Sequence, residues 1–463
     1  MRLREKDEFR KRIGYYGDCL RTLPEYKAAI DKCISFQKNI SEEEKLFLNI
    51  YAPVITMYAG WILREAFKNG IKRVYFLARD ARPVYMAATA LERSVHTGID
   101  IRYLKVSRYA LRRAEYMLPD TDKAGLICSG AMNVTFRNVM DRGGLDKEEA
   151  ERLAELTGYK GKEDKKLKYP ELRELSECLK KNEYFEKYVT AHSVKAYENT
   201  MGYLIQEGLA DDIPYGIADS GWLGTMQKSI GHLIDYSMGN HKKITGYYFG
   251  LYELPGSVNP GDYRCFYFRP YKDIKRKVFF DVCLFETICS SKDGMTVGYK
   301  ELPDGGFAAV ESNNGNPNEE LIEKHEDLLG QYLDCMELAD GLRLSKERTD
   351  AAVSVIYKIF SQHMGRPTAV EVNIYGSLKF CDDVTENSFS NLASRWGRKE
   401  LRNNNLVIKI LIKSGMIKRD ASESGWPEGS IVNAGIQISR MLLNERIYRW
   451  LMYIRKAAFS RGK

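Results

Sequence analysis

The 463-residue sequence predicts an α/β fold with a mainly parallel, Rossmann-like sheet, a large helical insertion and a helical C-terminal region. Short apolar segments alternate with helical patterns, which is typical of parallel sheets. Several of these segments end directly in charged or glycine-rich residues, as strands do where a sheet binds ligands. With 44% hydrophobic and 29% charged residues, the chain has the composition of an ordinary globular protein.

Cysteine usage and charge limit the class of protein. The nine cysteines are scattered without a CxxC pair, which favours a reducing, cytoplasmic compartment. The charged segment 1–12 does not resemble a signal peptide. Of the net charge of +8, most comes from residues 434–463, which hold seven Lys or Arg and one acidic residue. The rest is nearly neutral, so we do not expect a nucleic-acid partner.

The N-terminal part is predicted to be helical. Residues 1–40 form an amphipathic helical segment, and a long helix over 42–69 opens with a capping box made by Ser41 and Glu44. Within it, residues 46–63 carry no charge and approach the length of a membrane span. Because asparagine, proline and tyrosines interrupt this run, we interpret it as a buried helix of a soluble core.

An α/β core is predicted over 41–311, interrupted by a charge-rich helical insertion at about 112–208. In this core, strands are expected within 72–80 and at 101–106, 215–218 and 244–252, helices near 83–93, 225–233 and 278–289, and a hairpin at 295–302 and 306–311.

The C-terminal region, 319–463, follows a polar linker at 312–318. It is expected to be helical to about 415, to form a loop at 426–430 and to end in one long basic amphipathic helix. Apolar residues at helical spacing beside a basic stripe (Arg446, Arg449, Lys456) are typical of a helix on anionic lipid. Peripheral membrane contact through 438–463 and docking against the protein's own body both remain open.

The segment Tyr215–Gln227 carries the most specific chemical pattern. A strand ends at Asp219, and two glycines then open a helix, where backbone N–H groups can bind an anion and the glycines let a phosphate approach. Asp219 can reach sugar hydroxyls or a metal ion. A strand-to-helix turn without a ligand is the alternative. The predicted substrate-binding residues are Ser220, Gly221, Trp222, Gly224, Thr225 and Gln227.

Charged residues also follow two other predicted strands. Arg79, Asp80 and Arg82 should lie at the carboxyl edge of the sheet, where two guanidiniums suit a phosphate or pyrophosphate. Asp80 can hold Mg²⁺ or accept a proton, although a surface Arg–Asp pair would also explain the pattern. Ser107 and Arg108 follow the next strand and are expected substrate contacts.

Glu286 lies in an otherwise apolar helix. A buried carboxylate must be paired or functional, so Glu286 is either a base for an acceptor hydroxyl or the partner of a core arginine. The predicted catalytic residues are therefore Asp80, Asp219 and Glu286, with Asp80 and Asp219 as the expected metal ligands.

Several of these segments resemble one family. FLARDA (76–81) resembles an FLxRDG element, and ADSGWLGTMQ (218–227) resembles D-x-G-W-x-G-T-x-Q; LFETICSSKDGMTVGY (284–299) and Trp426–Ser430 also look familial. These elements mark the glycan phosphoribosyltransferase (gPRT) domains of bacterial polysaccharide ribofuranosyltransferases. The resemblance implies a phosphoribosyltransferase-like (PRTase-like) sheet. Ala81 departs from the family pattern, which has glycine there.

The resemblance implies transfer of 5-phosphoribosyl from phosphoribosyl pyrophosphate (PRPP) to a hydroxyl of a lipid-linked or oligosaccharide glycan, with inversion, in capsule or O-antigen synthesis. It implies Mg²⁺, a phosphate cradle at Gly221–Thr225, and Asp80, or secondly Glu286, as base. The family's phosphatase domain of haloacid-dehalogenase type has no counterpart motif here, so a separate phosphatase is implied. The enzyme would work in the cytoplasm or on the inner face of the membrane.

Two other functions remain open. Asp80 after a strand is also compatible with a sugar phosphatase of haloacid-dehalogenase type, although Arg82 stands where such an enzyme needs a second aspartate. A non-catalytic assembly protein, held at the membrane by the basic C-terminal helix, is the other alternative.

Overall fold

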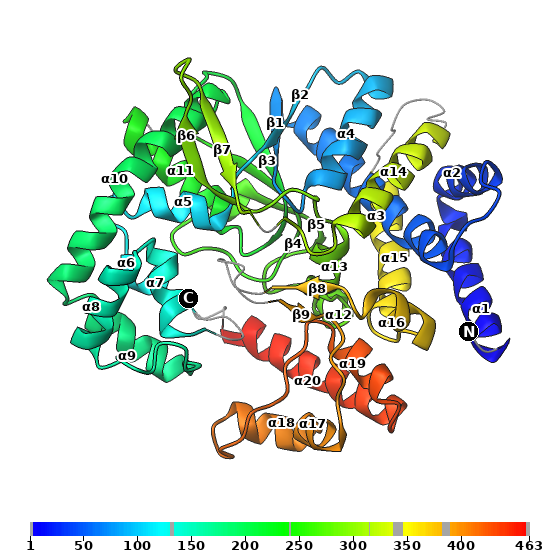
Figure 1. The fold of residues 1–463 in the computed structure, drawn as a ribbon. Helices are drawn as coiled ribbons and strands as arrows, with labels where there is room; N and C mark the ends of the chain where they lie inside the picture. The colour runs from blue at the N-terminus through cyan, green and yellow to red at the C-terminus, as the bar shows by residue number, and fades with distance from the viewer. Residues whose placement is uncertain are drawn as a thin grey trace.

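A computed structural model describes residues 3–129, 134–239, 242–313, 315–336, 346–381 and 389–459. Its centre is a five-stranded sheet in the order β2-β1-β3-β4-β5, in which every pair is parallel (Figure 1). The strands are β1 Arg73–Leu77, β2 Asp100–Leu104, β3 Tyr215–Trp222, β4 Thr245–Leu251 and β5 Tyr263–Phe268. This confirms the predicted mainly parallel α/β fold.

The strand order creates a crevice between β1 and β3. From β1 the chain crosses to β2 on one side, and it later returns to place β3 on the other side. In open α/β sheets, ligands bind outside the carboxyl ends of the strands at such a reversal of order. Because Phe76 pairs with Ala218, the chain segments that begin at Leu77 and Asp219 leave the paired region at the same edge.

Helices cover both faces of the sheet (Figure 1). On one face, Val74, Phe76 and Phe249 pack in a large apolar cluster with helices from both ends of the chain. On the other face, Tyr75 and Ile217 pack in a second cluster. The first layer contains α1 Leu3–Cys19, α2 Pro24–Ser35, α3 Glu42–Lys68 and α4 Arg82–Val95, and the second contains α5 Arg108–Glu115, α10 Glu183–Gln206 and α11 Thr225–Met238.

Helix α3 begins as predicted. The Ser41 hydroxyl accepts a hydrogen bond from the Glu44 N–H (3.2 Å), and the Glu44 carboxylate accepts one from the Ser41 N–H (2.6 Å). The helix is long and apolar enough to cross a membrane by length and composition, but its most apolar window is entirely buried inside the described structure. This burial fits a core helix.

Short helices form most of the region predicted as an insertion. They are α6 Lys123–Ile127, α7 Phe136–Gly143, α8 Lys147–Thr157 and α9 Tyr169–Leu179, and they share an apolar cluster with the start of α10. The predicted hairpin is also present, as β6 Thr296–Glu301 and β7 Phe307–Glu311, and it packs on α10.

Two predicted boundaries in the core were wrong, and one strand, β5, was not predicted from the sequence. Strand β3 does not end at Ala218 but continues to Trp222, because its last residues pair with β4 as far as Leu251. The helix expected at 278–289 is two helices, α12 Ile274–Val278 and α13 Val282–Ile288, because Asp281 accepts a hydrogen bond from the Leu284 N–H (2.9 Å) and starts a new helix.

The C-terminal region is less uniformly helical than predicted. A short antiparallel pair, β8 Lys379–Phe380 and β9 Ser390–Asn391, interrupts it, and the loop expected at 426–430 instead begins a helix with Pro427 in its first turn. The helices of the C-terminal region are α14 Glu319–Cys335, α15 Lys346–His363, α16 Ala369–Tyr375, α17 Arg398–Asn403, α18 Leu406–Lys413, α19 Pro427–Ala434 and α20 Ile438–Phe459. Elsewhere in the described chain, 3₁₀ turns lie at Leu20–Thr22 and Pro260–Asp262.

Gly221→Ala should destabilise the sheet. Gly221 has φ of +120°, and a Cβ there would lie 2.2 Å from the Gly250 carbonyl oxygen on β4. We expect the free energy of unfolding to fall by about 2–3 kcal/mol, measured by urea denaturation. Gly239→Ala is the matched control, since Gly239 also has positive φ but faces open space. Equal losses in the two variants would contradict a steric role for Gly221.

Candidate active site

A cleft of about 200 Å³ opens at the carboxyl edge of the sheet beside β1. Since a single water molecule needs only about 10–15 Å³ of such volume, the cleft is large enough for a small polar ligand. Its lining comes from the segments after β1 and β2, from α13, from the start of β6 and from the C-terminal region. The lining includes Arg79, Asp80, Ser107, Arg108, Tyr109, Met226, Cys283, Glu286, Thr287, Thr296, Asn316, Asn318, Lys379 and Phe389.

Five residues predicted from the sequence line this cleft. Arg79 and Asp80 follow β1, and the Ala78–Arg79 peptide bond is cis. Ser107 caps α5: its hydroxyl accepts from the Ala110 N–H (3.0 Å) and donates to the Thr296 carbonyl (2.6 Å). The other two, Arg108 and Glu286, are described below with the charges of the site.

Asp219 is only 5% exposed and is not among the residues that line the cleft in the described structure. Burial, and secondly the nearby charge of Asp80, raise the pKa of its carboxyl group to about 8, although Arg108 and the N–H groups of Ser220 and Gly221 oppose this rise. The structure therefore brings Asp80, Asp219 and Arg108 together, as their positions at neighbouring strand ends predicted.

Glu286 belongs to the same group of charges. Burial is the main cause that raises its pKa, and Asp80 adds to it, whereas a hydrogen bond from the Trp222 indole and the charge of Arg108 lower it. Trp222 has φ of +74°, a conformation that non-glycine residues adopt uncommonly. Its indole N–H donates to Glu286, and Trp222 is not among the described residues that line the cleft, so its placement does not support the predicted substrate contact.

Asp219→Asn should change how stability depends on pH. The unfolded chain releases the Asp219 proton near pH 4, whereas the native protein keeps it to about pH 8. The stabilisation from this extra proton is present at low pH and is lost as pH rises toward the native pKa. Relative to wild type, we expect the variant to gain at least about 1 kcal/mol of unfolding free energy between about pH 5 and about pH 8.

Urea denaturation of both proteins at each pH measures this difference. Asp120→Asn is the control, because Asp120 is an exposed acid. A variant whose stability follows that of wild type across the whole range would show that Asp219 is ionised in the native protein at neutral pH.

The predicted glycine cradle contacts the protein itself. The missing side chain of Gly221 makes room for the Gly250 carbonyl, and a Cβ on Gly224 would lie 2.7 Å from the Tyr263 ring. Ser220 is buried within β3, and Thr225 starts α11 without lining the cleft in the described part of the chain. These glycines are therefore required for packing, and the neighbouring Met226 is what α11 presents to the cleft.

Gln227 and Arg82 also have structural partners. The Gln227 amide donates to the Ile244 carbonyl (2.9 Å) and accepts from the Tyr248 hydroxyl (2.7 Å), which ties α11 to β4. Arg82 starts α4 and pairs with Glu326 of α14 (3.4 Å). Neither residue belongs to the described lining of the cleft, so the prediction that they bind substrate is not supported by their placement.

Ala81, where the family pattern has glycine, fits its position. It caps α4 with φ of −87° and ψ of 4°, which an L-residue adopts without strain. The departure from the pattern therefore has no local steric cost.

The C-terminal region contributes a wall of the cleft that was not predicted from the sequence. Lys379 on β8 lines the cleft, and its backbone exchanges two hydrogen bonds with the Asn318 side chain (2.7 and 2.9 Å). Asn316 holds the other end of this segment by donating to the Ser291 carbonyl (2.9 Å). The polar segment 312–318 was predicted to be a linker. Its asparagines were the only feature of that segment that could have indicated hydrogen bonds to the wall of the cleft.

In the ranges that the structure describes, no three His, Cys, Asp or Glu side chains are grouped so as to hold a metal ion. Mg²⁺, however, is commonly bound by one or two carboxylates together with substrate phosphates. Burial, and secondly the charge of Asp80, disfavour the ionised form of Asp219, and a bound divalent cation would oppose both effects. The pair therefore fits the expected ion by its chemistry.

Together, the fold and the cleft define an α/β protein with a charged cleft at the carboxyl edge of its sheet, near the point where the strand order reverses. Comparison with models of known protein families finds none that matches the chain, and comparison with curated proteins finds no match either.

Proposed function

We propose that the protein is a glycan phosphoribosyltransferase that moves 5-phosphoribosyl from PRPP to a glycan hydroxyl with inversion. The observation that carries the proposal is that Asp80, Glu286 and Arg108 line one cleft and that the buried Asp219 lies close enough for their charges to act on it. Carboxylates suit a reaction in which positive charge develops on a sugar carbon, and cations suit a donor with phosphates at both ends. The motif resemblance supplies the particular donor.

The described side chains suggest how the donor would lie. Arg79, Arg108 and Lys379 supply positive charge around the cleft, and they replace the glycine cradle as the proposed phosphate contacts. Mg²⁺, held by Asp80 and Asp219, would neutralise charge on the pyrophosphate.

In the proposed reaction, the acceptor oxygen forms a bond to C1 of the ribose from the face opposite the pyrophosphate. The C1–O bond to pyrophosphate breaks, and its electron pair leaves with pyrophosphate. Asp80 accepts the proton of the acceptor hydroxyl, and Glu286 is the second candidate for this role because it also lines the cleft. The product keeps its 5-phosphate, so a separate phosphatase would act next.

The test is incubation of the purified protein with PRPP, Mg²⁺ and a panel of synthetic glycan acceptors. Mass spectrometry should detect an acceptor that has gained one phosphopentose, with release of pyrophosphate. If no acceptor gains mass and calorimetry detects no PRPP binding, the proposal is wrong. Release of inorganic phosphate from sugar phosphates would instead favour the phosphatase alternative.

A further inference from the structure

Helix α20 exposes an apolar face along its whole length. Leu443, Ile447, Leu451 and Ile454 are each 37–50% exposed, and their spacing of three or four residues places them on one side of the helix. Nine of the 21 exposed large apolar side chains among the described residues lie between 407 and 459. Such clustering is unusual for a surface that faces only water.

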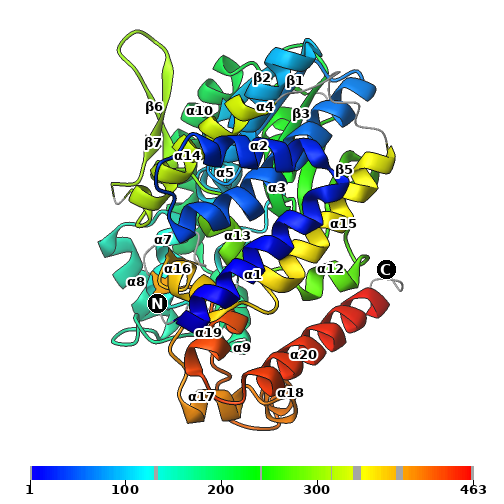
Figure 2. The same cartoon turned by 90° about the vertical axis from the view of Figure 1, so that its right-hand side faces the viewer.

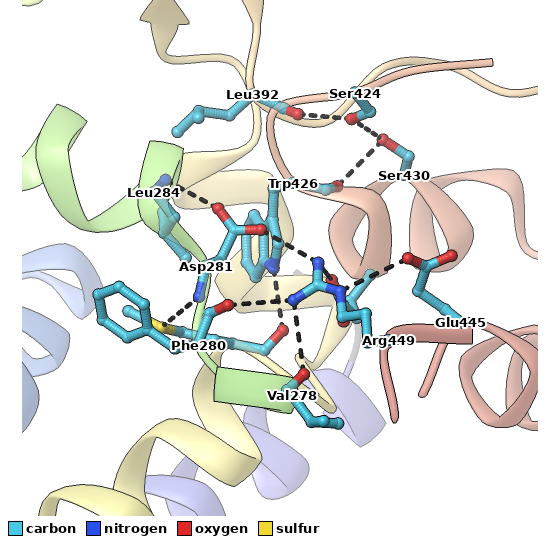
Figure 3. Close-up of polar contacts among 12 residues, drawn as sticks. Val278, Phe280, Asp281, Leu284, Leu392, Ser424, Trp426, Ser430, Glu445 and Arg449 are labelled. Atoms are coloured by element: carbon cyan, nitrogen blue, oxygen red, sulfur yellow. Dashed lines mark hydrogen bonds and ion pairs between the residues drawn. The ribbon is translucent and has the colours of Figure 1, made fainter. Parts of the chain in front are cut away.

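The opposite side of α20 fixes the helix to the protein. The Arg449 side chain, which is 11% exposed, lies there between Asp281, Glu428 and Glu445, and it donates to the Phe280 carbonyl (3.0 Å) (Figure 3). Lys409 of α18 adds an ion pair to Glu445 (2.6 Å). The exposed apolar face is therefore not needed to hold α20 in place, and the helix runs along the edge of the molecule (Figure 2).

This edge of the molecule is strongly basic. Residues 389–459 contain 13 Lys or Arg and five Asp or Glu. On α20, the exposed Arg440 and Arg455 lie on or beside the apolar face, whereas Lys456 lies on the opposite side and pairs with Glu253 (2.6 Å). The single acid of the helix, Glu445, is buried. Long basic side chains beside an apolar helix face can reach lipid phosphates while the apolar residues enter the interface.

We infer that the outer face of α20, defined by Leu443, Ile447, Leu451 and Ile454, lies on an anionic lipid surface. The charge of the helix favours an anionic lipid surface over a second copy of the chain, because two copies of this basic helix would repel each other if their apolar faces met. An anionic surface instead attracts every basic residue around the face. The inference does not depend on the proposed function.

The test is cosedimentation of the full chain with vesicles. We expect binding to vesicles of phosphatidylcholine mixed with phosphatidylglycerol, weaker binding at high salt, and little binding to phosphatidylcholine alone. The double variant Ile447→Gln, Leu451→Gln should reduce binding by about tenfold or more. The matched control is Val194→Gln, Ile205→Gln, which changes two similarly exposed residues of α10 and should bind like wild type.

Any of three results would overturn the inference. The first is equal loss of binding in both double variants, and the second is no binding of the wild-type chain to anionic vesicles. The third is a dimer, measured by light scattering, that the α20 variant disrupts while vesicle binding stays absent. We expect melting curves to show that the variants are folded, since the changed residues lie on the surface.

Discussion

Asp80→Asn should reduce phosphopentose transfer by about 10²–10⁴-fold, the usual contribution of a general base. Asp80 lines the cleft after β1, and its charge acts on both Asp219 and Glu286. The amide keeps the size of the side chain but cannot accept the proton of the acceptor hydroxyl. Initial rates with PRPP and a reactive acceptor measure the effect.

Two further variants test whether Asp80 acts as the general base or affects the rate in another way. Glu286→Gln tests the second candidate, and Asp120→Asn controls for loss of a surface acid. Nearly unchanged PRPP affinity in Asp80→Asn, measured by calorimetry with Mg²⁺, would assign the loss of rate to the base, whereas weaker PRPP binding would assign it to the Mg²⁺ ligand. A larger loss of rate in Glu286→Gln than in Asp80→Asn would transfer the role to Glu286.

Arg449→Met should lower the free energy of unfolding by about 3–5 kcal/mol, because it leaves buried carboxylates without their cation. The guanidinium lies 2.9 Å from Glu428, 3.4 Å from Asp281 and 3.5 Å from Glu445 (Figure 3). Burial already raises the pKa of Asp281 to about 6, and Arg449 opposes that rise. Methionine fills similar space without charge.

Arg455→Met is the matched control, because Arg455 lies on the same helix and is exposed. Urea denaturation compares the two variants, and we expect the control to remain within about 0.5 kcal/mol of wild type. Because Asp281 also caps α13, the helix that carries Glu286, the loss of Arg449 should disturb the wall of the cleft as well. Similar stability of both variants would show that the Arg449 cluster contributes little.

The placement of Asp80, Asp219 and Arg108 could be predicted from the sequence. Asp80 and Arg108 follow apolar strands, and Asp219 follows the apolar residues of β3, although the strand itself continues to Trp222. The carboxyl ends of parallel strands meet at one edge of a sheet. The role of the glycines could not be predicted, since a glycine required by a neighbouring strand has the same sequence pattern as one required by a phosphate. Gly221 is required by a neighbouring strand, because a side chain there would collide with the Gly250 carbonyl of β4.

The contribution of Lys379 to the lining of the cleft also could not be predicted from the sequence. It reaches the cleft because Asn318 holds β8 through hydrogen bonds between residues 61 positions apart. No local periodicity encodes such a contact. The same reason explains why Trp222 was predicted as a substrate contact, when its partner Glu286 lies 64 residues away.

Helix α20 shows most clearly which properties the sequence determines and which depend on the tertiary structure. Local spacing alone determined that 438–459 is a helix with an apolar side and a basic side, because both are properties of neighbouring residues. Only the tertiary structure decided which side faces the protein. Arg449 turns inward, because three acids from α13, α19 and α20 enclose it, and the apolar side is therefore left outward. That orientation depends on charges brought together by the fold, which no single segment contains.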